Sequence, residues 1–374
     1  MDTKKKSING LTAKNSKDSC AAEASKDSCT VETSINSLAA ATDIKNLPIA
    51  VSSRSFSKNE ELKKLLSAHF TSIKYNLTDR VLEAQELIDF LRGAEAAIVG
   101  LDKVTESVLI QLPHLKVISK YGVGINNLDL SAMKRQGIAF GWTGGVNARS
   151  VSELVLSFIL GLLRNVFVNS RKISQGVWRG TGGIQLSGKT IGIIGCGHIG
   201  KDLIKILKPF DCEILICDIL DMKEFCLEWE VDQVSKVNDR TSKQIERVSK
   251  QIEQVSKTEI LKRSDVVSLH VPYDSSTHHL IGASDFELMK STAILINTSR
   301  GEIVDENALC ESLKQKKIAG AAADVFANEP VGNCELVRLE NFVATPHIGG
   351  NSVEAVQAMG KSAIDNLVGL LAAK

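Results

Sequence analysis

The sequence predicts an α/β protein with two doubly wound parallel-sheet domains. Strand and helix patterns alternate from Leu47 onward, as in "PIAVSS" followed by "KNEELKKLLSAH", and the alternation begins again at "KTIGIIG" near residue 190. Such alternation is typical of parallel sheets whose two faces are covered by helices. The chain of 374 residues is also long enough for two domains of ordinary size.

The elements follow in order along the first half of the chain. Strands are expected at "PIAVSS", "TSIKYN", "AAIVG" and "LKVISKYGVG", and helices at "KNEELKKLLSAH", "VLEAQELIDFLRG" and residues 105–112. A longer helix is expected at about residues 148–170, because "VSELVLSFILGLL" is apolar around most of its circumference. A helix of this kind suits a connection between domains or a contact between subunits.

The first 46 residues depart from the globular pattern. They are rich in Ser, Lys, Asp, Ala and Thr, and they repeat the pentapeptide "SKDSC". Such a composition buries too little apolar surface to offset the entropy of ordering. We therefore expect residues 1–46 to form a disordered tail, with a short interaction motif as the alternative.

A second unusual segment lies at residues 234–257. A [VT]-S-K triplet recurs there every seven residues, and apolar residues spaced by three and four suggest a short coiled-coil seam. The seam residues are Ile245, Val248, Ile252 and Val255. Because the seam is shorter than a stable coiled coil, we predict a solvent-exposed helical insertion, with a partner-binding helix as the alternative.

Composition excludes several classes of protein. Lys plus Arg (45) nearly balances Asp plus Glu (44), which argues against a nucleic-acid partner. The longest apolar run, residues 154–163, is shorter than the roughly 20 residues that span a bilayer, and no secretory signal is evident. Eight cysteines lack C-x-x-C or zinc-like spacing. We expect a cytoplasmic protein with free thiols, no metal site and no membrane segment.

The segment "KTIGIIGCGHIGKDL" predicts a dinucleotide-binding turn. Gly195, Gly197 and Gly200 have the G-x-G-x-x-G spacing between a strand and a helix whose N-terminus binds phosphate. The next strand ends at Asp218, 18 residues after Gly200, where an acid bonds ribose hydroxyls and repels a 2′-phosphate. We therefore predict NAD rather than NADP; an ordinary aspartate at a strand end is the alternative.

Polar residues follow three later strands. "AILINTSRG" ends with Arg300, "AGAAADVFANEP" carries Asp324 and Glu329, and "NFVATPHIGG" leads to His347. Ligands of open α/β sheets bind at the carboxyl ends of the strands, where these residues are expected to meet.

Arg300, Glu329 and His347 together suit hydride transfer to and from a 2-hydroxy acid. A guanidinium binds a carboxylate through two parallel hydrogen bonds. Histidine, with an unperturbed pKa of about 6.5, accepts a hydroxyl proton near neutral pH, and a neighbouring carboxylate orients its ring. We predict that these three residues are catalytic; for each alone, a structural role is the alternative.

The ordered motifs "SKYGVGINNLDL", "SELVL", "LSGKTIGIIGCGHIGK", "SDVVSLHVP", "LINTSRGEIVDENAL", "ADVFANEP" and "TPHIGG" resemble those of the D-isomer-specific 2-hydroxyacid dehydrogenases. The resemblance covers about residues 47–374 and is greatest to the phosphoglycerate dehydrogenase-like branch. It implies a Rossmann NAD domain at 147–349 and a discontinuous, flavodoxin-like substrate domain at 47–146 and 350–374. It also implies a homodimer that associates through its NAD domains.

The resemblance implies roles for individual residues as well. Asp324 would bind the nicotinamide amide, and the backbone of Val123 and Gly124 would bind the substrate carboxylate. The predicted cofactor site further includes His198, Ile199, His270, Pro272 and Thr298. The predicted substrate site further includes Arg54, Lys120 and Tyr121.

Two departures from the family pattern bear on the substrate. The chain has "TGG" at residues 143–145 where the family often has "TPG", and Lys120–Tyr121 where phosphoglycerate enzymes often have Arg before Ala-Gly. These departures argue against 3-phosphoglycerate without excluding it, because Arg54, Lys103 and Lys120 are cations that could bind its phosphate. The candidate substrates are 3-phosphoglycerate and the pair glycerate and hydroxypyruvate. A non-enzymatic, NAD-sensing protein resembling a corepressor is the alternative function. A formate dehydrogenase is less compatible with an acidic partner for the histidine.

Overall fold

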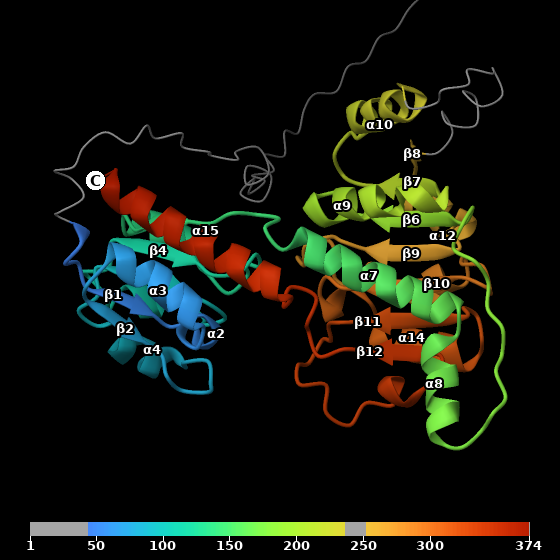
Figure 1. The fold of residues 1–374 in the computed structure, drawn as a ribbon, viewed down its shortest axis with the longest axis horizontal. Coiled ribbons are helices and arrows are strands. Elements are labelled where there is room, and N and C mark those ends of the chain that lie inside the picture. Colours follow the sequence, from blue (N-terminus) through green and yellow to red (C-terminus); the bar gives the residue numbers. More distant parts are fainter. Residues whose placement is uncertain (1–43, 236–251, 374) are drawn as a thin grey trace, which may run out of the picture.

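The computed structural model describes residues 44–235 and 252–373, which form two α/β lobes (Figure 1). The first lobe has a five-stranded parallel sheet in the order β2-β1-β3-β4-β5, and the second a seven-stranded parallel sheet in the order β12-β11-β10-β9-β6-β7-β8. These are the flavodoxin-like and Rossmann strand orders, respectively. The predicted fold class is confirmed.

The first lobe alternates strands and helices as the sequence predicts. Its strands are β1 (Ile49–Val51), β2 (Ile73–Tyr75), β3 (Ala96–Val99), β4 (Val117–Lys120) and β5 (Ala139–Gly141). Its helices are α2 (Arg54–Ser57), α3 (Glu60–His69), α4 (Ala84–Leu91), α5 (Glu106–Leu109) and α6 (Leu130–Arg135). Strand β5 is short and only partly buried, and the sequence analysis did not identify it.

The sheet of the second lobe begins at residue 190, after a connecting segment, residues 175–189, that contains several glycines. Its strands are β6 (Thr190–Ile194), β7 (Glu213–Cys217), β8 (Ile252–Gln254), β9 (Val266–Leu269), β10 (Ile294–Asn297), β11 (Gly320–Ala323) and β12 (Phe342–Ala344). Its helices include α9 (His198–Leu207), α10 (Lys223–Ser235), α12 (Lys257–Arg263), α13 (Ala283–Phe286) and α14 (Glu306–Lys314). Buried apolar residues pack against both faces of this sheet, as expected for parallel strands.

The last helix, α15 (Val353–Ala372), returns to the first lobe, where Figure 1 shows it lying across that lobe's sheet. Its apolar residues share one core with β1 and β3, and Ser119 Oγ donates to the Ala363 carbonyl over 2.7 Å. A methyl group added at Gly360 would collide with Leu62 of α3, so the two helices pack closely. The C-terminal segment therefore completes a core begun by residues near Ile49.

The long helix expected at residues 148–170 is interrupted, so that prediction is wrong. Helix α7 (Ala148–Leu163) ends before Asn165, which has the left-handed φ of 53°, and α8 (Val166–Ser174) continues at 67° to it. Asparagine tolerates this backbone conformation better than most residues, which explains the turn. Among the described residues, no single helix has the length and apolarity to cross a membrane, although the bent α7–α8 pair meets those criteria together.

The predicted helical insertion at residues 234–257 is wrong at its C-terminal end. Residues Ile252–Gln254 form β8, which pairs with β7, and Ile252 is buried in the core of the second lobe. An apolar residue such as Ile252 fits both a heptad seam and a buried edge strand. Its pairing with β7 shows that it belongs to the strand. Residues 236–251, with Ile245 and Val248, lie outside the described residues, as do residues 1–43 of the predicted tail.

Candidate active site

The glycine-rich turn brings a strand, a helix and a loop into contact. Gly195 follows β6 at φ +92°, and a methyl group there would lie 2.6 Å from the carbonyl carbon and oxygen of His270. A methyl group on Gly200 would lie 2.5 Å from the Gly195 carbonyl oxygen, so α9 packs directly on the turn. No side chain caps α9 at Gly197, which leaves the helix N-terminus suited to a phosphate group.

Asp218 organises the end of β7 beside this turn. Its Oδ2 accepts the Cys196 amide over 2.6 Å, and its Oδ1 accepts the Leu220 amide over 2.9 Å. The side chain of Ile219 is fully exposed next to it. A 2′-phosphate placed here would therefore meet a carboxylate and an apolar side chain, which favours the unphosphorylated ribose of NAD.

Arg300 joins the two lobes. It follows β10, its Nη1 donates to the Ser299 carbonyl over 2.6 Å, and its Nη2 donates to Asn126 Oδ1 of the first lobe over 3.3 Å. A methyl group on Gly124 would collide with the same Nη2. Burial lowers the pKa of Arg300, with Glu329 and Glu302 opposing the shift, and the guanidinium stays charged in any case. The guanidinium thus faces the backbone predicted to bind a carboxylate.

Glu329 and His347 form a hydrogen-bonded pair after the two adjacent strands β11 and β12. His347 Nδ1 lies 2.8 Å from Glu329 Oε2, while Glu329 Oε1 accepts the Phe326 amide over 3.0 Å. His347 has the uncommon left-handed φ of 55°, and its backbone nitrogen donates to the Asp324 carbonyl over 2.9 Å. The imidazole is about half exposed, so its Nε2 remains available to a substrate.

Asp324 holds the histidine loop in place. Its Oδ1 accepts Thr345 Oγ1 over 2.6 Å and the Ile348 amide over 2.8 Å, and its Oδ2 accepts the Gly349 amide over 2.7 Å. Two carboxylate oxygens have about four acceptor positions, so one remains for a ligand. The sequence analysis assigned Asp324 to the cofactor alone; the structure adds an architectural role for the loop that carries His347.

The turn at Gly122–Gly124 of the first lobe lies against Arg300 of the second. Trp142 Nε1 donates to the Val123 carbonyl over 3.0 Å, which fixes the peptide group before Gly124. Asn126 reaches across to Arg300. The sequence analysis missed both Asn126 and Trp142, although Asn126 stands only two residues beyond the "GVG" motif.

Of the other three predicted substrate residues, two are buried. Tyr121 is buried in the core and its ring packs edge-to-face on Phe56, with ring centroids 5.6 Å apart. Lys120 is also buried. Arg54 is exposed, but its Nη1 donates to the Asp79 carbonyl over 2.7 Å. No contact joins Arg54 or Tyr121 to the Arg300 group among the described residues.

Two buried polar atoms in the predicted cofactor region lack partners within the described protein: Thr298 Oγ1 and His270 Nδ1. The other ring nitrogen of His270 lies 2.9 Å from Ser268 Oγ, and burial lowers the pKa of His270 to about 4. The ring is therefore neutral near pH 7. Unpartnered buried polar groups are costly, so these atoms fit a polar cofactor such as NAD.

The remaining predicted cofactor residues surround the turn. The His198 ring lies against Gly145, since a methyl group there would be 2.5 Å from its Cγ. Ile199 packs against the core shared with α7, and its carbonyl accepts Ser152 Oγ over 3.3 Å. Pro272 is exposed, and its carbonyl accepts Thr277 Oγ1 over 2.8 Å. His198 thus also touches the segment that connects the two lobes.

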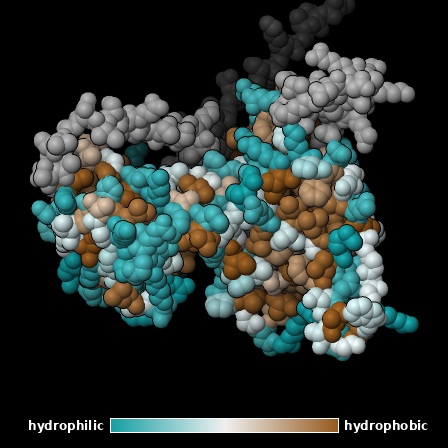
Figure 2. Space-filling view, in the orientation of Figure 1, coloured by the Kyte–Doolittle hydropathy of each residue, from teal (hydrophilic) through white to brown (hydrophobic). Residues whose placement is uncertain are grey.

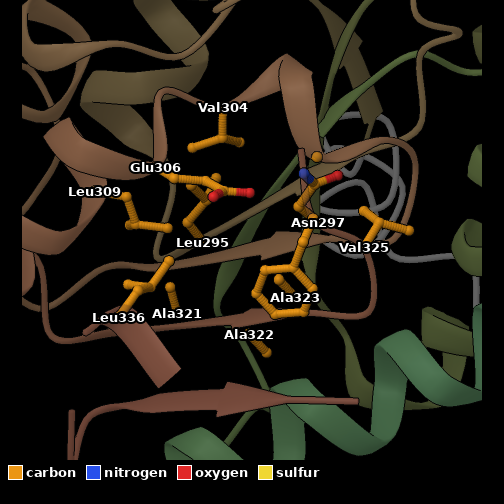
Figure 3. Close-up of a pocket in the computed structure, with 12 residues that line it drawn as sticks. Leu295, Asn297, Val304, Glu306, Leu309, Ala321, Ala322, Ala323, Val325 and Leu336 are labelled. Carbon is orange, nitrogen blue, oxygen red and sulfur yellow. The ribbon is translucent and has the colours of Figure 1, made fainter. Parts of the chain in front are cut away.

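A small cavity lies behind the Arg300 loop, between β10, β11 and α14 (Figure 3). Its lining is mainly apolar, with Leu295, Leu309 and Phe326 among the contributing side chains. The cavity volume of about 10 Å³ has room for roughly one water molecule. It is therefore too small for a substrate, and the candidate site is the region where Arg300 meets the Gly122–Gly124 turn.

The described part of the chain shows no grouping of three or more His, Cys, Asp or Glu side chains arranged to hold a metal ion. The six cysteines in that part have free thiols. Burial raises the pKa of Cys196 to about 12 and that of Cys212 to about 11. These two thiols are therefore protonated near neutral pH and act as apolar core groups.

Comparison with known proteins decides the family. A family model described as "D-isomer specific 2-hydroxyacid dehydrogenase, NAD binding domain" matches residues 156–349. A glyoxylate reductase of Thermofilum pendens is 37% identical over 295 residues, which cover 77% of this chain and 81% of that protein. The chain belongs to this family. A D-3-phosphoglycerate dehydrogenase of Methanocaldococcus jannaschii is 35% identical over 282 residues, which cover 75% of this chain. This match spans only 50% of that relative's length.

Solved structures agree with the assignment to D-isomer-specific 2-hydroxyacid dehydrogenases. A D-lactate dehydrogenase from Aquifex aeolicus, complexed with NAD and lactic acid, matches with a TM-score of 0.70 and 26% identity, covering 86% of this chain and 94% of that one. A D-2-hydroxyisocaproate dehydrogenase matches with a TM-score of 0.72 and 25% identity, covering 86% and 96%. The predicted family, its class of NAD-dependent oxidoreductases and NAD as cofactor are confirmed.

Proposed function

We propose that this protein is an NAD-dependent enzyme that interconverts a D-2-hydroxy acid and the corresponding 2-keto acid. The observation that carries the proposal is the 2.8 Å contact between His347 Nδ1 and Glu329 Oε2, at the same edge of the sheet as Arg300. A base with an orienting carboxylate, next to a carboxylate-binding cation, is the set that this chemistry requires.

The residues divide the reaction between them. Arg300 and the amides of the Gly122–Gly124 turn hold the substrate carboxylate, which fixes C2 of the substrate. The glycine-rich turn and Asp218 would hold NAD, which would supply the hydride acceptor for oxidation and, as NADH, the hydride donor for reduction. His347 Nε2 takes the hydroxyl proton during oxidation and returns it to the carbonyl oxygen during reduction. Glu329 engages Nδ1, which keeps Nε2 directed toward the substrate.

We infer that the substrate is small and carries no phosphate group, as in the pair glycerate and hydroxypyruvate or in glyoxylate. Of the three cations suggested for a phosphate, Lys120 is buried, Arg54 donates to the Asp79 carbonyl, and Lys103 is exposed. Glyoxylate reductases and phosphoglycerate dehydrogenases both occur among the relatives, so the substituent on C3 is the part of the proposal to test.

The proposal is tested by the loss of NADH absorbance with a panel of 2-keto acids. The panel contains glyoxylate, hydroxypyruvate, its 3-phosphate, pyruvate, 2-oxoglutarate and a branched-chain acid. We expect turnover with glyoxylate or hydroxypyruvate and slower turnover with NADPH. A preference for the phosphate would refute the substrate assignment, and no turnover with any acid would refute the enzymatic proposal.

His347→Ala identifies the chemical step. We expect a loss of about 10²–10⁴-fold in kcat, the range typical of a general acid or base, with NADH binding nearly unchanged. Asn351→Ala is a suitable control, because its side-chain amide donates to the backbone carbonyl of His347, over 3.2 Å, and not to the imidazole ring. Unchanged kcat in the His347 variant would remove this residue from the mechanism.

A non-enzymatic NAD-sensing role is the second candidate, because binding NAD requires only the glycine-rich turn and Asp218. It predicts tight NADH binding without oxidation by any 2-keto acid. The near-neutral charge balance of the chain gives no support to a nucleic-acid partner for such a sensor. A cytoplasmic location stays a prediction.

We further propose a homodimer that associates through the second lobe. Figure 2 shows hydrophobic side chains gathered on this lobe over α7. Leu156 and Leu160 of α7 are only partly buried, and Val166, Phe167 and Ile173 of α8 are exposed. A contiguous apolar surface of this kind is typical of a subunit interface. Sedimentation at micromolar concentration should give a dimer, and a monomer would contradict the proposal.

A further inference from the structure

Lys120 is a buried cation without a counter-ion. The residue is only 4% exposed, and its Nζ donates to the Gly100 carbonyl and to Asn127 Oδ1, the latter over 3.0 Å. No carboxylate in residues 44–229 or 252–373 lies within ion-pair distance of it. A buried charge is costly unless it is paired, and here the buried Asp102 carboxylate compensates the ammonium only at a distance, without a direct ion pair.

The ammonium is fixed in place. Asn127 Nδ2 donates to the carbonyls of Gly100 and Asp102 over 3.0 and 2.6 Å, which locks the amide that accepts from Lys120. The Asp102 carboxylate is itself occupied, because it accepts Ser52 Oγ over 2.6 Å and the Leu82 amide over 3.1 Å. Lys120 is therefore held at the end of β4 rather than free to reach solvent.

The lysine lies beneath the backbone that faces Arg300. Its Cε is 3.9 Å from the position of a methyl group on Gly122, so its stem runs under the Gly122–Gly124 turn. Arg300 contacts the same turn from the other lobe, next to Gly124. Two cations from different lobes thus flank the short segment that is predicted to bind a carboxylate.

Lys120 and Arg300 are the two cations beside the turn, and the Asp102 carboxylate acts on Lys120 without a direct ion pair. Burial lowers the pKa of Lys120 to about 8; Asp102 opposes that shift and Arg300 adds to it. The acidic groups that face Arg300 are Glu329 and Glu302. An anion bound at the turn would relieve the repulsion between the two cations and would raise the pKa of Lys120.

We propose that Lys120 is a positioning residue that supplies the second buried positive charge for the substrate carboxylate, acting from beneath the Gly122–Gly124 turn. This inference rests on the proposed function, because it assigns the carboxylate to that turn. It predicts that substrate binding takes up a proton on Lys120 at alkaline pH. Affinity for the 2-keto acid should then fall as Lys120 loses its proton, by up to about tenfold per pH unit.

The experiment measures binding of oxamate, an unreactive analogue of a 2-keto acid, to the full chain saturated with NADH. Calorimetry at pH 8.5 in two buffers of different ionisation enthalpy reports the protons taken up. We expect an uptake of about 0.7 proton for the wild type, since a group with a pKa near 8 is mostly unprotonated at that pH. Oxamate binding without proton uptake would overturn the inference, as would the absence of oxamate binding.

Two substitutions and a control assign the proton. Lys120→Arg keeps the charge but does not titrate in this range, so proton uptake should vanish while affinity at pH 7 changes little. Lys120→Met removes the charge, and we expect oxamate affinity at pH 7 to fall by about tenfold or more, with NADH affinity retained. Lys116→Met at the other end of the same strand region serves as the control, because Lys116 pairs with Glu95 at the surface.

The outcomes separate this inference from the proposed function. Unchanged proton uptake in Lys120→Arg would place the proton elsewhere and overturn the inference, even if Lys120→Met fails to fold. NADH oxidation by a 2-keto acid is measured independently, so an active enzyme without proton uptake would refute only the role of Lys120. An inactive protein that binds oxamate with proton uptake on Lys120 would refute only the catalytic proposal.

Discussion

Gly301→Ala is expected to disable catalysis by displacing a loop on a neighbouring strand. Gly301 directly follows Arg300, and a methyl group there would collide with the Phe326 carbonyl carbon and the Ala327 amide and would lie 2.5 Å from Phe326 Cα. Carbon atoms in contact prefer about 3.5–4.0 Å, so the loop has to retreat by at least about 1 Å. The Phe326 amide donates to Glu329 Oε1, and the retreat therefore moves the carboxylate that orients His347.

A displacement of about 1 Å in a catalytic arrangement costs on the order of 10²-fold in rate. We therefore expect kcat/KM of Gly301→Ala to fall by about 100-fold, and overpacking to lower the free energy of unfolding by about 1–3 kcal/mol. NADH affinity should change little, because the glycine-rich turn lies on a different strand. Steady-state kinetics, thermal unfolding and NADH fluorescence measure the three quantities.

The matched control is Gly182→Ala. Gly182 has no atom within 4 Å of an added methyl group, so this variant should keep both wild-type activity and stability. If Gly301→Ala keeps wild-type kcat/KM and thermal stability, the contact between the Arg300 and Glu329 loops does not position the catalytic pair. That result would refute the geometric reasoning.

Three further predictions concern charge. Asp218→Ser should lower the preference for NADH over NADPH by about tenfold or more, since the carboxylate that repels a 2′-phosphate is gone; an unchanged kcat/KM ratio would contradict this. Glu329→Gln should lower kcat by about 10²-fold with NADH affinity retained, because the orienter of His347 loses its charge; stopped-flow reduction of the keto acid measures the step. Because burial lowers the pKa of His270 from 6.5 to about 4, the unfolded chain binds a proton here that the folded protein excludes. The free energy of unfolding should therefore fall by about 3 kcal/mol between pH 6.5 and pH 4. The stability advantage of the wild type over His270→Asn should shrink by that amount in denaturant titrations, and a constant difference would argue against a buried neutral ring.

Local sequence patterns were sufficient for the fold class and for much of the site. The glycine-rich turn, Asp218 and the residues after β10, β11 and β12 depend on spacing within one strand–turn unit, so they could be placed without knowing the rest of the chain. Parallel strands then carry Arg300, Glu329 and His347 to one edge of the sheet.

Long-range contacts could not be predicted in the same way. Asn126 and Arg300 are 174 residues apart, and only the packing of the two lobes brings them together. The sequence suggests Lys120 as a cation that could bind a phosphate. The structure instead buries it against Gly100 and Asn127, which follow different strands. The heptad pattern misassigned Ile252, because side-chain spacing alone does not reveal which partner strand is available.

The return of α15 has a consequence for synthesis on the ribosome. The core of the first lobe contains Ile49 and Val51 as well as Ile364 and Leu371, so it closes only after α15 has emerged from the ribosome. The cores of the second lobe need no residue beyond position 343. The lobe that is synthesised later therefore completes its core first, and the earlier sheet exposes an apolar face that requires protection until α15 has emerged.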